Sequence, residues 1–262
     1  MTAERILPME GIHNFRDYGG YTARDGAQFR TGFLYRSGQH LDATRDDLAM
    51  VSALKLKTVI DLRGDSERVN YPCARPEDFQ AQILFAPGET ADRHGTAPHL
   101  EAAEAVRTAE QARQAMARLY TSMPYRPNLV ATLRLYFEAL AAREGASLIH
   151  CLAGKDRTGL AVGLLHKLLG VHDDDIRADY LLTNIAGNLE RRIAAGAVVI
   201  RRNYGEQIED DAIRTLMSVE AHYLDNAFSA IVERHGSIDA YAEDVLLVTP
   251  DKLEKMEAYL LS

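Results

Sequence analysis

A cysteine and an arginine, Cys151 and Arg157, are separated by five residues in the segment LIHCLAGKDRTG, which spans residues 148–159. A thiolate is a strong nucleophile, and a planar guanidinium can hold two oxygens of a phosphate group in a bidentate fork. The intervening residues let the chain curl, so that the guanidinium meets the phosphate oxygens while the sulfur lies beneath phosphorus. A lysine in place of Arg157 would not reproduce this fork. The spacing therefore predicts attack on a bound phosphoryl group, with Cys151 as nucleophile and Arg157 as phosphate clamp.

The same segment has the pattern of a strand, a tight turn and a helix start. Apolar residues lead up to His150, small and polar residues follow, and a helix is expected to begin near Thr158. In such a turn, successive backbone N–H groups point inward and the helix adds its positive end, which together bind a dianion such as phosphate or sulfate. The predicted phosphate-binding residues of the loop 150–159 are Leu152, Ala153, Gly154, Lys155, Asp156, Arg157 and Thr158.

The loop should also activate its nucleophile. A helix N-terminus and nearby cations favour the ionised form of a thiol, and Lys155 and Arg157 are close to Cys151 in sequence. The Thr158 hydroxyl could donate a hydrogen bond to the sulfur. A cysteine at a strand end is more often a small buried hydrophobic residue, but the arginine and threonine at this spacing, with the preceding histidine and the glycine in the turn, favour a phosphate loop.

The elements that must position this loop alternate between strands and helices. Apolar residues recur at helical spacing over residues 48–54 and 129–140. Short aliphatic runs are predicted to be buried strands: Thr58–Leu62, Gln82–Phe85, Ser147–Cys151 and, as a further candidate, Gly32–Tyr35. This alternation predicts an α/β sheet with helices packed on its faces.

Downstream of Cys151 the chain should be helical, because apolar residues recur only at three- and four-residue spacing. Capping chemistry predicts helix boundaries at Gly170, Asp173–Asp175, Gly236-Ser237 and Thr249-Pro250. Two segments, residues 90–127 and about 184–217, are additions to a minimal sheet core. They could form a helical lid over the loop or could be solvated helices that only thicken the fold.

Composition limits the classes of function. The 262 residues are 47% hydrophobic and carry a formal net charge of −8, so we expect residues 1–262 to form one domain that does not bind nucleic acid. No stretch approaches the roughly 18 apolar residues of a transmembrane helix. There are two cysteines, Cys73 and Cys151, which are too few for a disulfide framework and are not spaced as in a structural metal site. We expect a cytoplasmic protein without metal or cofactor. Export by a route that the sequence does not reveal and the oligomeric state stay open.

At these residues the chain resembles the cysteine-dependent protein tyrosine phosphatases, and more closely the bacterial branch whose loop reads HCxAGKDRTG. Further segments follow that branch's order along most of the chain: Asn14-Phe15-Arg16-Asp17, Tyr35-Arg36-Ser37, Asp61-Leu62-Arg63, Ala178-Asp179-Tyr180 and His235-Gly236-Ser237. The resemblance implies a phosphotyrosine phosphatase-like α/β fold with a central, mostly parallel sheet of about four or five strands flanked by helices. It also implies hydrolysis of phosphomonoesters through a phosphocysteine intermediate without a metal.

The substrate is left open. Lys155 and Asp156 resemble those of phosphatases that also accept phosphoserine, phosphothreonine or phosphoinositides, so the partner could be a phosphorylated protein, a phosphoinositide or a small metabolite. Two other classes compete: a pseudophosphatase that binds phosphate without turnover, and a sulfur-transfer enzyme with a similar cysteine loop. The intact Cys151 and Arg157 disfavour the first, and the spacing of Arg157 with the Thr158 hydroxyl disfavours the second.

A general acid should protonate the leaving oxygen. The resemblance implies that Asp156 can serve. Its neighbours Lys155 and Arg157 would favour its ionised form, which predicts an acidic optimum if Asp156 is the acid.

Other carboxylates compete for this role. Related enzymes tend to carry an acid after an aromatic residue and a proline, but here Pro87 is followed by a glycine, so that Glu89 or Asp92 would be displaced candidates. Asp61 is a further candidate, although a carboxylate beside Arg63 at a strand end is more often a structural ion pair. We rank Asp156 first, then Glu89 or Asp92, then Asp61.

Three smaller predictions concern residues around the loop. The resemblance implies that His150 orients the loop through hydrogen bonds, and its side chain should point away from that of Cys151. Residues 14–17 should form a turn packed beside the loop, with Arg16 or Asp17 ion-paired. Cys73 could form a protective disulfide with oxidised Cys151, although an isolated second cysteine is more often a bystander.

The charged residues of the two additions allow two interpretations. The stretch over residues 110–118 and the pairs Arg191-Arg192 and Arg201-Arg202 are typical of solvated helix faces. If the second addition folds over the site, these arginines could attract acidic substrates.

Overall fold

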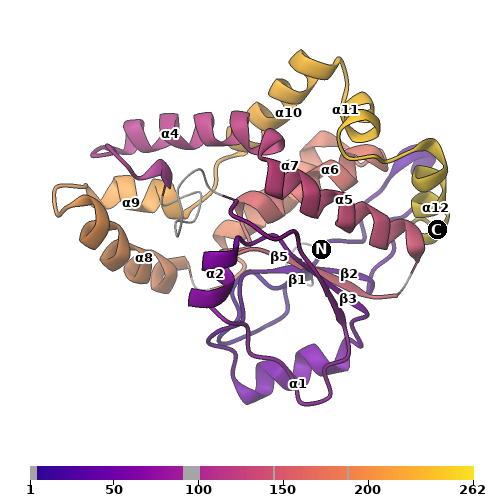
Figure 1. The fold of residues 1–262 in the computed structure, drawn as a ribbon, viewed down its shortest axis with the longest axis horizontal. Coiled ribbons are helices and arrows are strands. Elements are labelled where there is room, and N and C mark those ends of the chain that lie inside the picture. Colours follow the sequence, from indigo (N-terminus) through magenta and orange to yellow (C-terminus); the bar gives the residue numbers. More distant parts are fainter. Residues whose placement is uncertain (1–4, 91–100, 144, 188) are drawn as a thin grey trace.

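The computed structural model describes residues 5–90, 101–143, 145–187 and 189–262 and contains a five-stranded sheet with helices on its faces (Figure 1). The strand order is β1-β2-β5-β3-β4. β1 is antiparallel to β2, and all other neighbours are parallel. The bounds are Arg16–Asp17 (β1), Leu34–Ser37 (β2), Thr58–Asp61 (β3), Gln82–Leu84 (β4) and Ser147–His150 (β5). The predicted α/β class and mostly parallel sheet are confirmed.

Both faces of the sheet are buried, which explains the uninterrupted apolar runs of its parallel strands. Along β5, Leu148 joins a cluster with Val51 of α1 (Arg45–Ala53). The next residue, Ile149, joins the opposite cluster, which includes Leu133 of α5 (Pro127–Ala142) and Leu160 of α6 (Asp156–Leu168). Because successive side chains of a strand point to opposite faces, one short strand contributes to two cores.

The helices follow the predicted alternation and the predicted helical C-terminal part. The remaining ones are α2 (Asp65–Asn70), α4 (Ala109–Ser122), α7 (Asp173–Leu181), α8 (Leu189–Tyr204), α9 (Asp210–Met217), α10 (Ala221–His235), α11 (Ile238–Asp244) and α12 (Pro250–Leu260). Strand β1 and helix α2 were not predicted. Within the described ranges, no helix is both long and apolar enough to cross a membrane.

Helix ends follow the predicted capping chemistry, with one difference. Gly170 takes φ +74° just beyond α6, a conformation that glycine adopts without strain. The side chains of Ser237 and Thr249 accept hydrogen bonds at the starts of α11 and α12. At α7 the N-cap is His172, whose ring accepts from the Asp174 N–H. The acidic run that was predicted to cap this helix lies in its first turn instead, where it compensates the helix dipole.

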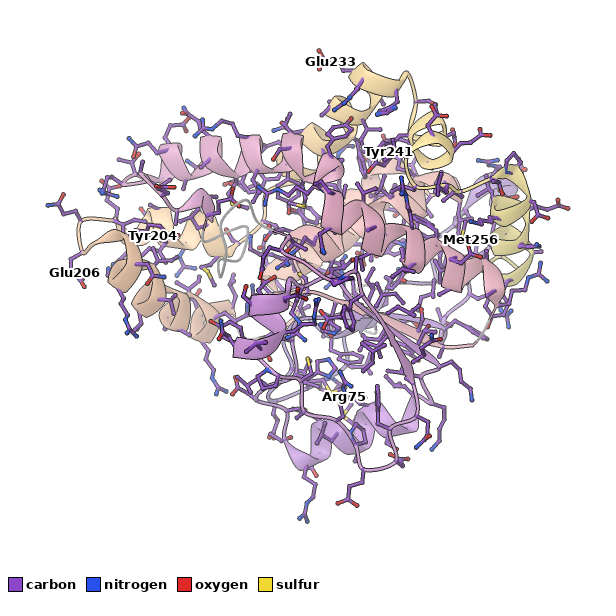
Figure 2. All side chains as sticks on the ribbon, viewed as in Figure 1. Arg75, Tyr204, Glu206, Glu233, Tyr241 and Met256 are labelled. Carbon is purple, nitrogen blue, oxygen red and sulfur yellow. The ribbon has the colours of Figure 1, made fainter. Side chains whose placement is uncertain are left out.

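Helices from the two additions pack together beside the sheet. α4 contacts α9 and α10, and α9 contacts α8. In Figure 1, α4, α8 and α9 stand to the left of the sheet, and α10 lies above it. Figure 2 places Tyr204 and Glu206 at the outer end of this group, away from the strands. The inner side of the group is therefore the side that can reach the loop between β5 and α6.

Candidate active site

The predicted phosphate loop lies at the edge of the sheet where the parallel strands end. His150 closes β5 and pairs with Ser37 of β2 on one side and with Asp61 of β3 on the other. Residues 151–155 then lead into α6, which begins at Asp156, two residues earlier than predicted. Segments that follow three neighbouring strands therefore surround the loop, the usual position of a site in a parallel sheet.

The loop has the polarity of an anion-binding nest. Among the described residues, no acceptor takes a hydrogen bond from the backbone N–H groups of Leu152, Ala153, Gly154 and Lys155. The carbonyl oxygens, in contrast, are engaged: that of Leu152 accepts from the Gln39 N–H at 3.0 Å, and that of Gly154 accepts from two side chains. The amide groups that remain, with the N-terminus of α6, can coordinate a dianion.

Gly154 sets the conformation of the loop. Its φ is +68°, and a Cβ atom there would lie 2.4 Å from the Ser37 carbonyl oxygen, so only glycine fits. Its carbonyl oxygen accepts hydrogen bonds from Asn14 Nδ2 at 2.6 Å and from Arg36 Nη2 at 3.1 Å. Asn14 occupies a turn beside the loop, as predicted, but the turn does not extend over residues 14–17, because Arg16 and Asp17 pair with β2 as strand β1.

A buried ion-pair cluster supports these two donors. Asp179 of α7 binds Arg36 (Nη1 to Oδ2, 2.7 Å) and Arg16 (Nε to Oδ1, 3.3 Å), and Arg16 donates to Asn14 Oδ1. Burial opposes ionisation of Asp179, but the two guanidinium groups outweigh it and lower the pKa of this carboxyl. Burial and the charge of Arg36 lower the pKa of Arg16 to about 10, so Arg16 stays charged at neutral pH. The scattered motif segments therefore converge on the Gly154 carbonyl.

Cys151 lies at the base of the loop and is 2% exposed. The hydroxyl of Thr158, in the first turn of α6, is buried and has no hydrogen-bond partner among the described residues, so its proton remains available to a thiolate. The His150 ring lies on the sheet face that carries Leu148, with Nδ1 3.3 Å from the Cys151 carbonyl oxygen. Burial lowers the pKa of His150 to about 4, so this imidazole is neutral at pH 7.

The Arg157 guanidinium is held by Glu67 of α2. Nη2 lies 2.7 Å from Glu67 Oε1, and Nη1 bonds to Oε2, to the Leu62 carbonyl oxygen at 3.0 Å and to Thr90 Oγ1 at 2.7 Å. Burial disfavours the charge, but Glu67 outweighs it and raises the pKa of Arg157. The carboxylate occupies the Nη1–Nη2 end of the guanidinium, which leaves the Nε–Nη2 side for two phosphate oxygens. The guanidinium of the predicted clamp is thus held in one orientation without a ligand.

Asp156 shares one carboxylate oxygen between two donors. Lys155 Nζ lies 2.7 Å and Tyr120 Oη 2.9 Å from Oδ1. Tyr120 comes from α4 and also lies 2.5 Å, hydroxyl to hydroxyl, from Tyr180. Burial lowers the pKa of Lys155, and Asp156 opposes this shift. The first addition therefore reaches the loop through Tyr120.

The other candidate acids have different surroundings. Glu89 accepts hydrogen bonds from the backbone N–H and the hydroxyl of Ser66, at 3.0 and 2.8 Å, where α2 begins. Asp61 bonds to Arg63. Burial opposes its charge, but His150 and Arg63 lower the pKa of Asp61 to about 2, and because His150 is neutral at pH 7, Arg63 supplies the positive charge. A carboxylate that is ionised at neutral pH is a poor acid. Asp92 lies outside the described residues.

Cys73 lies beside two imidazoles. Its Sγ accepts from the His40 N–H at 3.4 Å, and it shares a cavity of about 10 Å³ with His40 and His150. Burial raises the pKa of the Cys73 thiol, which disfavours the thiolate that disulfide exchange requires. Both cysteines are free, and the disulfide with Cys151 stays a prediction.

The second addition covers one side of the loop. A cleft of about 320 Å³ lies between them, lined by Leu152 and Ala153 of the loop and by Arg191, Arg192 and Val199 of α8, among others. Arg191 is exposed, as a solvated helix face predicts. Arg192 is only 7% exposed, so the prediction that it lies on a solvated helix face is wrong. Its position in the helix turns it inward, toward the cleft.

Two residues of the site, Glu67 and Tyr120, were not predicted. Arg192 was named only as one of four arginines that could attract acidic substrates if the second addition folds over the loop. Glu67 could have been found as an acidic residue in the segment that follows β3. This segment begins at the sheet edge where the loop also begins, because β3 and β5 are parallel. The available signal for Arg192 was the alternative that α8 folds over the loop. Tyr120 left no signal, since one tyrosine on an amphipathic helix is usually a packing residue.

A buried thiol at a strand end, a turn with unengaged amide groups and an arginine oriented by a carboxylate define the class of this site. These features are the ones expected of the phosphate loop of a cysteine-dependent phosphatase, and here they stand on a mostly parallel α/β sheet.

Comparisons with known proteins agree. The profile of the tyrosine phosphatase family matches residues 7–262, and the chain belongs to this family. It is 33% identical over 248 residues to a protein of Cupriavidus necator provisionally named a tyrosine-protein phosphatase. This alignment covers 92% of this chain and 84% of the relative. It is 28% identical over 268 residues to the triple specificity protein phosphatase PtpB of Mycobacterium tuberculosis, with 92% and 94% covered.

Among solved structures, TpbA of P. aeruginosa matches with a TM-score of 0.32 and 17% identity over 76% of this chain and 97% of that one. Family membership confirms the predicted class of enzyme: the protein is a tyrosine phosphatase, a phosphoric monoester hydrolase. Neither a sulfur-transfer enzyme nor a phosphate-binding pseudophosphatase is favoured by these relatives.

Proposed function

We propose that this chain hydrolyses phosphotyrosine in two displacements at phosphorus, with Cys151 as nucleophile, Arg157 as phosphate clamp and Asp156 as general acid. The supporting observation is the set of loop N–H groups that no described residue engages, beside a buried thiol. These groups and the Nε–Nη2 side of Arg157 would surround the phosphoryl oxygens. Donors already oriented toward developing charge are the largest single contribution to many enzymatic rates.

In the first displacement the Cys151 thiolate attacks phosphorus, the P–O bond to the leaving group breaks, and Asp156 transfers its proton to the departing oxygen. In the second, the Asp156 carboxylate takes a proton from water as the water oxygen attacks phosphorus. The S–P bond then breaks, and phosphate and thiolate are regenerated. One phosphomonoester and one water give one alcohol and one phosphate. The Thr158 hydroxyl would stabilise the thiolate each time it forms.

For the substrate we propose a phosphorylated protein first. The apolar stretch of the cleft beside Leu152 and Ala153 suits an aromatic leaving group. The described contacts of the site gather around the phosphate position, and the name of the PtpB relative describes three specificities. We therefore extend the proposal to phosphoserine, phosphothreonine and phosphoinositides, with α4, α8 and α9 as a lid. A reducing cytoplasm would keep Cys151 free.

The test of the mechanism uses aryl phosphates with good and poor leaving groups, in the presence of a chelator. Cys151→Ser should abolish turnover that the chelator leaves intact in the wild type. Asp156→Asn should slow phenyl phosphate by roughly a hundred- to ten-thousand-fold and para-nitrophenyl phosphate far less, because a good leaving group needs no proton.

Glu89→Gln and Asp61→Asn are the matched carboxylate controls. They should slow both substrates alike or not at all. Equal losses on both substrates in Asp156→Asn, with a leaving-group-dependent loss in Glu89→Gln, would transfer the acid assignment to Glu89. Turnover that survives Cys151→Ser would remove the phosphocysteine step.

A further inference from the structure

The charged groups around the nucleophile form neutral pairs, with one exception among the described residues. Arg157 pairs with Glu67, and Lys155 pairs with Asp156. The guanidinium of Arg192 forms no hydrogen bond or ion pair with any described residue, and its Nη2 atom is buried. A buried guanidinium without a partner is costly, so a protein retains one only where something compensates it.

Arg192 faces the reaction centre. It lines the same cleft as Leu152 and Ala153 of the loop. Burial lowers the pKa of Arg192, and the nearby Asp156 and Cys151 oppose this shift. The guanidinium therefore lies within electrostatic reach of both the nucleophile and the proposed acid, whereas the adjacent Arg191 side chain is exposed.

We propose that Arg192 is a second phosphate-binding residue, which reaches from α8 to the non-reacting oxygens of the phosphoryl group held in the loop. The proposal deepens the proposed function and rests on it, because the ligand is the phosphate of that reaction. A thiolate and a phosphate dianion bring like charges together, and neutral ion pairs do little to offset them. Arg192 supplies the uncompensated positive charge, and it makes α8 part of the substrate site.

The test measures binding of inorganic phosphate to the full chain by isothermal titration calorimetry, which needs no turnover. Arg192→Met keeps an unbranched apolar stem and removes the charge. We expect phosphate affinity to fall about ten- to a hundredfold, the size of a charge-assisted hydrogen bond in a buried site. Arg202→Met, on the same helix but outside the lining of the cleft, removes an equal but exposed charge and should change the affinity less than about twofold.

Equal losses in the two variants would show that the charge of α8 attracts phosphate only in general, and this overturns the proposal. Unchanged affinity in Arg192→Met does the same. Urea unfolding of each variant checks the fold. If Arg192→Met does not fold, Arg192→Lys carries the test: the loss of the planar fork must weaken phosphate binding severalfold, and wild-type affinity contradicts the proposal.

These outcomes are separable from those of the proposed function. A chain that binds phosphate through Arg192 but turns over no aryl phosphate would refute the catalytic mechanism and leave the binding result standing. A chain that turns over aryl phosphates normally, but whose phosphate affinity does not depend on Arg192, would refute the role of Arg192 and leave the catalytic mechanism standing.

Discussion

Replacement of Glu67 by glutamine should destabilise the unliganded protein. The Glu67 carboxylate binds the Arg157 guanidinium at two points, and the side chains are 3% and 2% exposed. Removal of one partner from a buried ion pair costs about 3–5 kcal/mol, because it leaves the other charge buried without compensation. Arg157 would keep its bonds to Leu62 and Thr90, and glutamine retains one acceptor oxygen. We therefore expect the lower end, about 3 kcal/mol.

Phosphate should restore part of this loss, since the dianion supplies the negative charge that the substitution removes, and a ligand stabilises the state that binds it. The assay is urea unfolding followed by circular dichroism, with and without saturating phosphate. Asp65→Asn is the matched control: Asp65 lies on the same helix and pairs with Arg68, but its side chain is 54% exposed, so its ion pair should contribute little.

Two results would refute this reasoning. If Glu67→Gln unfolds within about 1 kcal/mol of the wild type, the pair does not hold a costly buried charge. If phosphate stabilises the variant and the wild type equally, Arg157 is not part of the phosphate site.

Two further predictions concern protonation. Tyr120→Phe removes a donor from the Asp156 carboxylate. It should therefore move the alkaline limb of the kcat/KM profile, where the general acid loses its proton, to higher pH by up to about one unit; an unchanged limb would separate Tyr120 from the acid. His150 should make stability depend on pH: burial lowers its pKa from 6.5 to about 4, so the unfolded chain binds the proton first as pH falls. Its contribution, about 3 kcal/mol, is complete above pH 6.5 and lost between 6.5 and 4. The urea midpoint of unfolding should therefore depend on pH more steeply in the wild type than in His150→Asn between pH 6.5 and 4. Parallel curves of midpoint against pH would contradict the prediction.

The fold was predictable wherever a segment carries its own periodicity. Strands buried on both faces read as short aliphatic runs, and the predicted bounds lie within two residues of β2, β3, β4 and β5. β1 has two residues and no period to detect. Helix α2 begins after Gly64, which offers no side-chain cap. Both elements are held by tertiary contacts, β1 by pairing with β2 and α2 through Glu67.

The same distinction separates the parts of the site. Residues 150–159 were predictable because a strand, a turn and a helix start are contiguous in sequence. Glu67 and Tyr120 lie 90 and 36 residues from Arg157 and Asp156, to which they bond. Arg192 lies 36 residues from Asp156, the nearby carboxylate that favours its charge. Arg192 is the clearest case. Residues 191 and 192 are both arginine, so their type does not distinguish them, and side chains at consecutive helix positions point in different directions. Only packing shows which of the two turns inward.

Two carboxylates, Glu67 and Asp156, lie beside the proposed phosphate position, but they bond to the cations there rather than facing the ligand alone. Glu67 orients Arg157 and leaves one side of its guanidinium for phosphate. Asp156 occupies Lys155 Nζ as long as it is ionised. When Asp156 carries the proton that the leaving group needs, the attraction to Lys155 falls and that ammonium group becomes available to the phosphate. The protonation state required for the first displacement is therefore also the state that binds the dianion more tightly, so that acid catalysis and substrate affinity should titrate together.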